Sequence, residues 1–346
     1  MRKAVEGEKN LDIVRCGVIG LGRLGYRHAA NLAHHVSGAK VTAVCDTVPG
    51  RAEQTARELG VPAFTEDPVA LLDRDDVDAV VVVTPTSTHG WFVDAVAQRK
   101  KALFLEKPLS LNLDEALRAV GAVRESGILC QLGFMRRFSP DYAHMEHHIK
   151  KGTIGKPLYF KGISRDPLAP PLDYVATSGG IFADQSIHDY DIARFLMGDE
   201  VVDVTAVGSI LYSAEVANYG DVDQAITYLR FASGSAGDVE ACRNAFYGYD
   251  IRAEVIGTEG TLSLASTHSN QVALLRPGRE SYETIPGFLE RFSEAYVIEL
   301  QHFIECVKTG TNPSVGVVDG YHALAVAQAA QMSYQQGCRK SVPMAL

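Results

Sequence analysis

What this 346-residue sequence lacks already limits what the protein can be. No apolar run approaches the roughly 18 residues of a membrane-spanning helix, so we expect a soluble protein without a membrane partner. No CxxC pair occurs among the six cysteines, which favours reduced core cysteines over a disulfide framework or a zinc site. No long Lys or Arg run accompanies the net charge of -9, which argues against a nucleic-acid partner.

The N-terminal stretch MRKAVEGEKNLD also lacks the apolar segment and the small-residue cleavage site of a secretory signal. We interpret it as a frayed leader before the first strand. Together with the expected free thiols, this interpretation predicts a cytoplasmic protein.

The sequence has enough apolar material for more than one core. It is 46% hydrophobic and 22% charged, and its length exceeds what one hydrophobic core usually organises, so we expect two domains. Residues 1–134 alternate Val-rich runs with helical patterns, which predicts βαβ units on a doubly wound parallel sheet. Strands are expected at 13–20, 40–46, 77–86, 101–108 and 128–134, and helices at 23–35, 51–60, 90–100 and 113–127.

Residues 135–346 have a different pattern, with longer strands that alternate apolar and polar residues, as antiparallel strands do. The sequence GTEG predicts a hairpin between two of them. We expect an α/β domain with a large open, mainly antiparallel sheet, whose apolar outer face is buried by oligomerisation, most simply into a tetramer. We also expect that the last helix can pack back on the first domain. Strands are expected at 201–210, 223–232, 235–245, 251–257, 261–266 and 271–277, and helices at 291–310 and 320–337.

The sequence GLGRLG follows the first expected strand and opens a helix. Gly20 permits a tight turn, Gly22 lets the backbone approach a pyrophosphate, and Gly25 allows close helix packing, as in dinucleotide-binding loops. Asp46 ends the second strand, where its carboxylate can accept hydrogen bonds from the adenosine ribose and would repel a ribose phosphate. These residues predict NAD rather than NADP as the cofactor.

Two further motifs, TPTSTH and EKP, follow the next two strands. Both lie at strand C-termini, where an open α/β sheet presents its ligand crevice. The fixed ring of Pro108 can set the position of Lys107, and the peptide between them is a candidate for the cis form.

The segment FADQSIHDYDIARFL, residues 182–196, places acids and a histidine on one expected helix. Asp184, His188 and Asp191 are spaced by four and three residues and would project from one face. The face is either solvated or a site that moves protons. Asp184 and His188 could also be metal ligands, but the dinucleotide fingerprint makes hydride transfer the simpler account, and we expect no metal. A second histidine cluster, HMEHH at 144–148, is better explained as an exposed polar helix than as a metal site.

The motifs GLGRLG, TPTSTH, EKP and GGIFADQSIHDYD together resemble those of the Gfo/Idh/MocA oxidoreductases. GFMRRFSPDY and SRDPLAPP resemble more narrowly the inositol 2-dehydrogenase branch. The similarity extends from the first strand to the last helix. It implies an N-terminal Rossmann domain, a second α/β domain with an open sheet, and assembly into tetramers.

The resemblance also implies residue roles. In the family pattern Lys107, Asp184 and His188 form the catalytic group beside the nicotinamide. Neutral His188 would accept the proton of a substrate hydroxyl, Asp184 would orient the imidazole or pair with Lys107, and Lys107 would stabilise the developing alkoxide. The expected substrate-binding residues are Lys107, Arg136, Asp184, His188, Asp191 and Tyr249, although Arg136 and Tyr249 could equally be ordinary structure. The expected NAD-binding residues are Gly20, Gly22, Arg23, Leu24, Gly25, Asp46, Thr84, Pro85, His89, Glu106 and Lys107.

These expectations favour an NAD-dependent dehydrogenase that oxidises a ring hydroxyl of a cyclitol, foremost myo-inositol to 2-keto-myo-inositol. A cleft lined by acids, bases and a tyrosine suits a polyol, because each hydroxyl both donates and accepts hydrogen bonds. The same chemistry on scyllo- or chiro-inositol, an aldose or an anhydrosugar is the first alternative. A non-catalytic NAD-binding regulator is an alternative of another class.

Overall fold

A computed structural model describes residues 12–265 and 267–344, and the proposed leader lies, up to residue 11, outside them. The chain divides into two compact units. The first unit comprises residues up to Met135 together with Glu294–Tyr321, and the second unit comprises Arg136–Ser293 together with the residues from His322 onward. The expected boundary after residue 134 lies one residue before this division.

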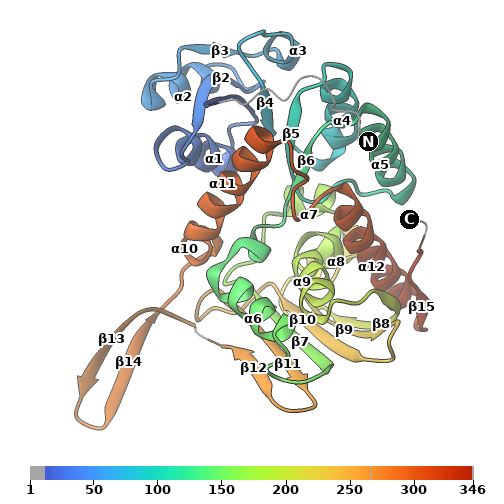
Figure 1. Cartoon of the computed structure of the whole chain (residues 1–346). Coiled ribbons are helices and arrows are strands. Elements are labelled where there is room, and N and C mark those ends of the chain that lie inside the picture. The colour runs from blue at the N-terminus through green and yellow to red at the C-terminus, as the bar shows by residue number, and fades with distance from the viewer. Residues whose placement is uncertain (1–11, 266, 345–346) are drawn as a thin grey trace. The chain divides into compact units, whose positions relative to one another are not determined.

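The first unit contains a six-stranded sheet in the order β3-β2-β1-β4-β5-β6, in which all neighbouring strands are parallel (Figure 1). This is the Rossmann order, with the reversal between β1 and β4. The sequence prediction omitted the short elements β3 and α3. The strands are β1 (Val14–Ile19), β2 (Ala39–Cys45), β3 (Ala63–Thr65), β4 (Ala79–Val82), β5 (Ala102–Glu106) and β6 (Cys130–Gly133), and the helices are α1 (Arg23–His34), α2 (Arg51–Leu59), α3 (Pro68–Leu72), the 3-10 turn η1 (Thr86–Thr88), α4 (His89–Gln98) and α5 (Leu113–Ser126).

The local sequence explains these helices. Asn112 caps α5 by accepting a hydrogen bond from the Glu115 N–H at 3.1 Å, and Gly127 ends the helix with a left-handed φ of 69°. A late segment, α11 (Ser293–Thr309), adds Leu300, Phe303 and Ile304 to the core between α1 and the sheet. Figure 1 shows α11 in orange-red beside the blue α1. The Rossmann core is therefore completed by residues that follow the larger segment of the second unit, Arg136–Ser293, in the sequence.

The second unit contains a seven-stranded sheet in the order β12-β11-β7-β10-β9-β8-β15. Only β7 and β10 pair in parallel, so the sheet is mainly antiparallel, as expected. The GTEG hairpin between β11 and β12 is confirmed. The sequence prediction missed β7. The strands are β7 (Pro157–Arg165), β8 (Val201–Ser209), β9 (Gln224–Phe231), β10 (Ala236–Cys242), β11 (Asp250–Gly257), β12 (Thr261–Leu264) and β15 (Lys340–Ser341).

Helices cover one face of this sheet. The buried Tyr190 of α9 shares a 2.8 Å hydrogen bond with Thr227 of β9, which joins this helix to the inner face. Strand β9 alternates strictly between buried and exposed residues. The other helices are η2 (Met135–Phe138), α6 (Pro140–Lys150), α7 (Leu172–Ser178), α8 (Gly180–Asp184), α9 (Ile187–Met197), η3 (Ala214–Tyr219), α10 (Phe288–Arg291) and α12 (Val317–Gln336), the first residues of which belong to the first unit.

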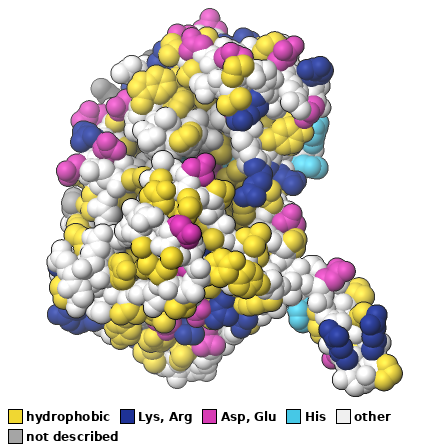
Figure 2. All heavy atoms as spheres, turned by 180° about the vertical axis from the view of Figure 1, so that it is seen from behind, with side chains coloured by type: hydrophobic (Ala, Val, Ile, Leu, Met, Phe, Trp, Pro, Cys, Tyr) yellow, Lys and Arg dark blue, Asp and Glu magenta, His cyan; other side chains and the backbone are white. Residues whose placement is uncertain are grey.

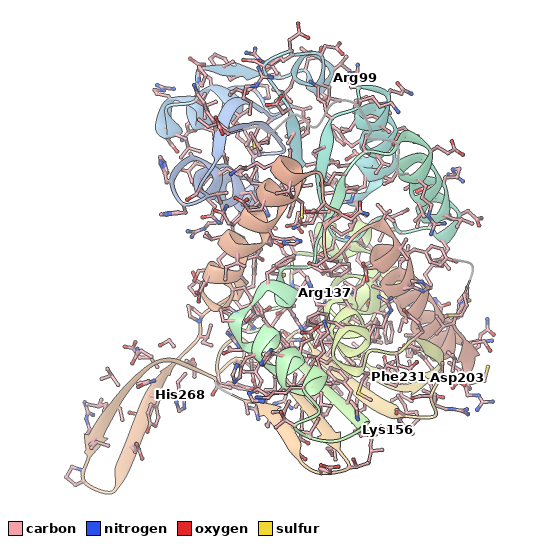
Figure 3. All side chains as sticks on the ribbon, in the orientation of Figure 1. Arg99, Arg137, Lys156, Asp203, Phe231 and His268 are labelled. Carbon is pink, nitrogen blue, oxygen red and sulfur yellow. The ribbon has the colours of Figure 1, made fainter. Side chains whose placement is uncertain are left out.

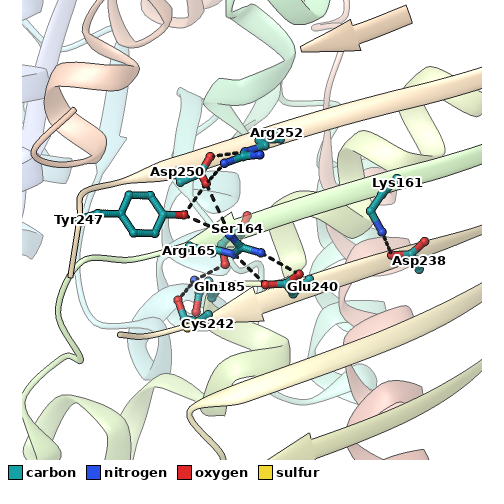
Figure 4. Close-up of polar contacts among 10 residues, drawn as sticks. All are labelled: Lys161, Ser164, Arg165, Gln185, Asp238, Glu240, Cys242, Tyr247, Asp250 and Arg252. Atoms are coloured by element: carbon teal, nitrogen blue, oxygen red, sulfur yellow. Dashed lines mark hydrogen bonds and ion pairs between the residues drawn. The ribbon is translucent and has the colours of Figure 1, made fainter. Parts of the chain in front are cut away.

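The outward face of the sheet is not uniformly apolar, contrary to expectation. Exposed Val207, Ile226 and Tyr228 share it with ion pairs between neighbouring strands. Figure 4 shows two of them, Lys161 with Asp238 at 2.9 Å and Arg165 with Glu240 at 2.7 Å.

The expected strand 271–277 does not join the large sheet. It forms a separate two-stranded hairpin, β13 (His268–Arg276) with β14 (Arg279–Thr284). His268, labelled in Figure 3, stacks on Tyr282 with 3.9 Å between the ring centroids. Figure 2 shows hydrophobic and basic side chains side by side on this projecting hairpin. It has no alternating buried face, because nearly all of its residues are exposed.

All six cysteines are free thiols, as expected, although Cys338 is exposed rather than in a core. Among the described residues no helix is long and apolar enough to span a membrane.

Candidate active site

The glycine loop between β1 and α1 has the geometry of a dinucleotide-binding turn. Gly20 has φ +85°, and a Cβ at Gly25 would lie 1.8 Å from the Gly20 carbonyl oxygen, so no larger residue fits at position 25. In contrast, a Cβ at Gly22 would meet nothing within 4 Å. Gly22 is the N-cap of α1 and provides no side-chain cap, and the N-terminus of a helix attracts an anion. Arg23 and Leu24 form the first turn of this helix.

Asp46 lies directly beyond β2 and is buried. Its two carboxylate oxygens accept hydrogen bonds from the backbone N–H of Leu21 at 2.7 Å and of Val48 at 2.8 Å. The guanidinium of Arg51 lies 3.2 Å away. Asp46 therefore fixes the glycine loop against the end of β2, in addition to the ribose contact expected of it.

The ends of β4 and β5 are joined through His89, which is buried at the start of α4. Its Nδ1 lies 2.7 Å from the carbonyl oxygen of Pro108, and its Nε2 lies 3.1 Å from that of Thr84. Burial lowers the pKa of His89, so the ring is neutral near pH 7 and carries one N–H. His89 thus connects the TPTSTH segment, including Pro85, to the EKP bend.

The EKP bend follows β5 and contains a cis peptide bond between Lys107 and Pro108, as the sequence suggested. The buried carboxylate of Glu106 accepts a hydrogen bond from the Lys107 N–H at 3.1 Å and one from His28 Nε2 at 2.8 Å. The backbone of Lys107 is therefore held from the protein interior. Lys107 is part of the first unit, whereas Asp184 and His188 are part of the second.

Asp184 and His188 do not lie on one continuous helix, contrary to expectation. Helix α8 ends at Asp184 and α9 begins at Ile187, and a wide turn between them has a hydrogen bond from the Ser186 N–H to the carbonyl of Ile181 at 2.9 Å. Gln185 lies in this turn, and its side-chain amide donates to the carbonyls of Ser164 and Cys242 in the sheet (Figure 4). The spacing of a regular helix does not apply across this turn.

Of Asp184 and His188, Asp184 is the less buried. Its carboxylate accepts a hydrogen bond from the Tyr174 hydroxyl at 2.9 Å and lies 3.6 Å from the guanidinium of Arg243. Arg243 is itself buried and paired with Asp221 at 2.5 Å. His188, in the first turn of α9, is 9% exposed. The carboxylate of Asp184 is thus held by two partners, and both side chains keep part of their surface exposed.

Arg136 and Asp191, two expected substrate-binding residues, take part in buried ion pairs. Arg136 donates to Asp189 at 2.8 Å and to the Ser164 hydroxyl at 3.0 Å. Burial opposes its charge, but the pairing with Asp189 raises the pKa of Arg136 above its ordinary value. Arg137, labelled in Figure 3, binds both carboxylate oxygens of Asp191, at 2.8 and 2.5 Å. These pairs fix α9 against the segment that follows β6.

Tyr249 is buried just before β11, and its ring packs edge-on against Phe292 with 6.4 Å between centroids. Burial raises the pKa of Tyr249, against the opposing effect of the nearby Arg136. The phenol therefore remains a neutral hydrogen-bonding group near pH 7.

Two residues near the EKP bend were missed by sequence reasoning, namely His28 of α1 and Glu299 of α11. Both are completely buried beside Glu106. A signal was present, because Glu299 lies one turn from Tyr296 and Phe303 on the apolar side of its helix.

Fold and loop together define a dinucleotide-dependent oxidoreductase of two units, one a Rossmann domain and the other an open-sheet α/β domain. Two family models support this class. Residues 14–134 match the model described as "Oxidoreductase family, NAD-binding Rossmann fold", and residues 147–344 match "Oxidoreductase family, C-terminal alpha/beta domain". The chain belongs to the Gfo/Idh/MocA oxidoreductase family.

Individual relatives agree with this assignment. The chain is 52% identical over 324 residues to a scyllo-inositol 2-dehydrogenase (NAD(+)) of Bacillus subtilis, covering 94% of this chain and 95% of the relative. It is 41% identical to a myo-inositol 2-dehydrogenase of Thermotoga maritima, covering 93% and 97%. A crystal structure of scyllo-inositol dehydrogenase from Lactobacillus casei with NAD(H) and scyllo-inositol superposes with a TM-score of 0.91 at 30% identity, covering 95% and 99%.

Proposed function

We propose that this protein is an NAD-dependent inositol 2-dehydrogenase that oxidises a ring hydroxyl of a cyclitol to a ketone. The observation that carries the proposal is the 52% identity, over nearly the whole of both chains, to a relative named for this reaction. The chain has Lys107, Asp184 and His188 at the motif positions implied by the family resemblance.

The proposed primary substrate is myo-inositol, and scyllo-inositol is the second candidate. The relative at 52% identity is named for the scyllo isomer, whereas the relative at 41% is named for the myo isomer. The two isomers differ only in configuration at C2, so oxidation of either at that carbon gives the same ketone. Which isomer the enzyme oxidises depends on the side of the ring at C2 that faces the proton acceptor.

The first unit fits NAD on its own geometry. The glycine loop leaves open space beyond Gly22, the α1 N-terminus lacks a side-chain cap, and Asp46 is placed at the end of β2. When bound, NAD supplies the hydride acceptor of the reaction. The N–H groups of α1 would hold the pyrophosphate, and Asp46 would hold the ribose and disfavour a ribose phosphate.

The proton chemistry is assigned to three side chains. His188 accepts the proton of the substrate hydroxyl as the carbon gives up its hydride, and Lys107 donates a hydrogen bond to the same oxygen as alkoxide charge develops. Asp184 stabilises the cation that forms, while Tyr174 and Arg243 hold its carboxylate in place. The anchored backbone of Lys107 supports this role, because an electrostatic stabiliser must be positioned before charge develops.

The remaining substrate contacts are also proposals. Tyr249, as a neutral phenol, is suited to hydrogen bonding with a ring hydroxyl. Direct contact of Arg136 and Asp191 with substrate remains a prediction, and their buried ion pairs favour a positioning role.

Location and assembly complete the proposal. We place the protein in the cytoplasm, in agreement with its six free thiols. We also propose a homotetramer in which the outward face of the seven-stranded sheet is buried, because Val207, Ile226 and Tyr228 are otherwise left in water.

The test is a panel of purified inositol isomers, aldoses and anhydrosugars, assayed by NADH absorbance, with NAD and NADP in parallel. We expect myo- and scyllo-inositol to give the highest kcat/KM with NAD, and both to yield the same ketone by mass spectrometry and NMR. A preference for an aldose would overturn the substrate, and equal use of NADP would contradict the role of Asp46. Tight NAD binding without turnover of any polyol would favour the regulator.

A further inference from the structure

Behind the EKP bend the first unit buries a histidine and two glutamates that the mechanism above does not use as acids or bases. His28 comes from α1, Glu106 from β5 and Glu299 from α11, and their exposed fractions are 0%, 6% and 0%. One nitrogen or oxygen atom from each lies within 4.8 Å of those of the other two. The rings of Phe104 and Tyr296 pack edge-on against His28, at centroid distances of 5.3 and 5.6 Å, so the surroundings are apolar.

The hydrogen bonds of this cluster are unequally distributed. Glu106 accepts two, one on each oxygen, from His28 Nε2 and from the Lys107 N–H. Glycine at position 133 leaves room for the Glu106 carboxylate, because a Cβ there would lie 2.8 Å from the Glu106 carboxyl carbon. Neither carboxyl oxygen of Glu299 has a hydrogen-bond partner among the described residues. Glu299 is nevertheless fixed, since Gln131 donates to its backbone carbonyl at 2.9 Å.

This distribution determines where a proton must be. Two carboxylates buried this close cannot both be ionised at ordinary cost when His28 is the only possible cation of the cluster. Glu106 has a hydrogen-bond partner on each carboxyl oxygen, whereas neither carboxyl oxygen of Glu299 has one among the described residues. The proton therefore belongs on Glu299. Burial, followed by the charge of Glu106, raises the pKa of Glu299 well above its ordinary value, in agreement with the geometry.

We propose that Glu299 is a positioning residue, kept as a neutral carboxylic acid, that confines the negative charge of the cluster to Glu106 and so fixes the backbone of Lys107. The functional part of this proposal rests on the proposed role of Lys107. The protonation part does not, because it concerns only the folded protein.

A metal ion is a less suitable occupant of the same residues. The 2.8 Å separation of His28 Nε2 and Glu106 Oε1 is that of a hydrogen bond. A metal bound to both atoms would break this contact. The metal would also draw Glu106 away from the Lys107 N–H, from which Glu106 accepts a hydrogen bond at 3.1 Å.

The proposal has a defined pH dependence. The groups that face Glu299 are His28 from α1, Glu106 from β5 and the uncharged Gln131 from β6. On its own helix, Tyr296 contacts His28, and His302 is turned towards Cys306 and the N–H of Ser314. Because Glu299 keeps its proton in the folded state and loses it in the unfolded state above about pH 4.3, it favours folding at low pH. The folding constant then falls about tenfold per pH unit from that value up to its folded-state pKa.

The experiment compares wild type with Glu299→Gln, a neutral isostere, and with Glu305→Gln, an exposed control on the same helix. Urea unfolding from pH 5 upwards should show that Glu299→Gln removes a loss of folding constant of about tenfold per pH unit, which in wild type continues up to the folded-state pKa of Glu299, whereas Glu305→Gln should keep the wild-type dependence. Infrared difference spectra should show a protonated carboxyl band at pH 7 in wild type and in Glu305→Gln, and none in Glu299→Gln. An unchanged pH dependence in Glu299→Gln, or the absence of the protonated carboxyl band in wild type at pH 7, would overturn the protonation.

Activity tests the positioning. Glu299→Ala should lower kcat about tenfold or more with little change in NAD affinity, the scale of a lost support behind a catalytic group. Glu299→Gln should restore most of the lost activity, and a pH profile of kcat extended to alkaline values should be flatter for it than for wild type. Failure of Glu299→Gln to rescue, while folded and with the pH slope of stability removed, would overturn the positioning role. Absence of polyol turnover in wild type would instead overturn the proposed function, since the unfolding and infrared results need no substrate. Tight, stoichiometric Zn²⁺ binding that Glu299→Gln abolishes would establish a metal site and overturn the neutral acid.

Discussion

The two units of this protein fix their functional residues by different means. In the first unit, the glycine loop is fixed by contacts within a short stretch of chain: Gly25 packs on the Gly20 carbonyl, and Asp46 accepts a hydrogen bond from the Leu21 N–H. In the second unit, buried ion pairs join residues far apart in sequence, such as Arg136 with Asp189 and Arg137 with Asp191. A common cofactor can therefore be recognised from a local motif, whereas the substrate side depends on contacts that no local motif contains.

The largest effect should come from breaking a buried ion pair of the second unit. Arg136→Met leaves Asp189 as an uncompensated buried charge, and we expect a loss of about 3–5 kcal/mol in the free energy of unfolding. Arg165→Met removes a partly exposed pair with Glu240 and should cost about 1 kcal/mol or less. Denaturant unfolding measures both. Equal losses would show that burial does not distinguish these pairs.

The next effect connects both units through the reaction. Lys107→Met in the first unit and His188→Asn in the second should each lower kcat by roughly a hundredfold or more, with little change in NAD affinity. The double variant should fall well short of the product, because both residues serve one step. His147→Asn on the exposed face of α6 is the control and should retain activity. Near-full kcat in His188→Asn would make Lys107 the candidate base.

A smaller effect separates folding from cofactor binding within the glycine loop. Gly25→Ala places a methyl group 1.8 Å from the Gly20 carbonyl and should cost about 1–3 kcal/mol of stability as well as NAD affinity. Gly22→Ala meets no atom within 4 Å, so it should fold normally and weaken only NAD binding. Thermal unfolding and NAD titration would measure the two effects. A destabilised Gly22→Ala protein would contradict the distinction.

The smallest effect on stability should come from the outward face of the second unit. Val207→Lys changes an exposed residue and should alter the stability of the subunit by about 0.5 kcal/mol or less. If the face is buried between subunits, the same change should break the assembly, as light scattering would show. A wild-type monomer of 37.5 kDa at micromolar concentration would contradict the proposed tetramer.

Sequence reasoning succeeded where the determinants are local. The strand, the glycine loop and the helix of GLGRLG follow from spacing alone, and the cis bond before Pro108 was anticipated from the Lys-Pro pair. Nicotinamide chemistry and the family also followed from these motifs, and the family models confirm them.

Sequence reasoning failed where contacts between residues distant in sequence determine the structure. The break between Asp184 and His188 lies at Gln185, whose side-chain amide donates to the carbonyls of two strands, and a helical pattern contains no sign of these contacts. Strand β7 was missed because its pairing with β10, about eighty residues later, has no local signature. Glu299 was not identified from the sequence, since the other members of its cluster come from α1 and β5.

The return of the chain to the first unit has a consequence for how the protein is made. Leu300, Phe303 and Ile304 belong to the Rossmann core, yet the whole of Arg136–Ser293 precedes them in synthesis. A nascent chain that ends at residue 135 has the glycine loop but lacks the α11 residues of the hydrophobic core. The first unit is therefore completed only after most of the second unit has been synthesised. A gene fragment encoding residues 1–134 alone should yield an aggregation-prone product, and adding residues 294–309 through a short linker should restore its folding.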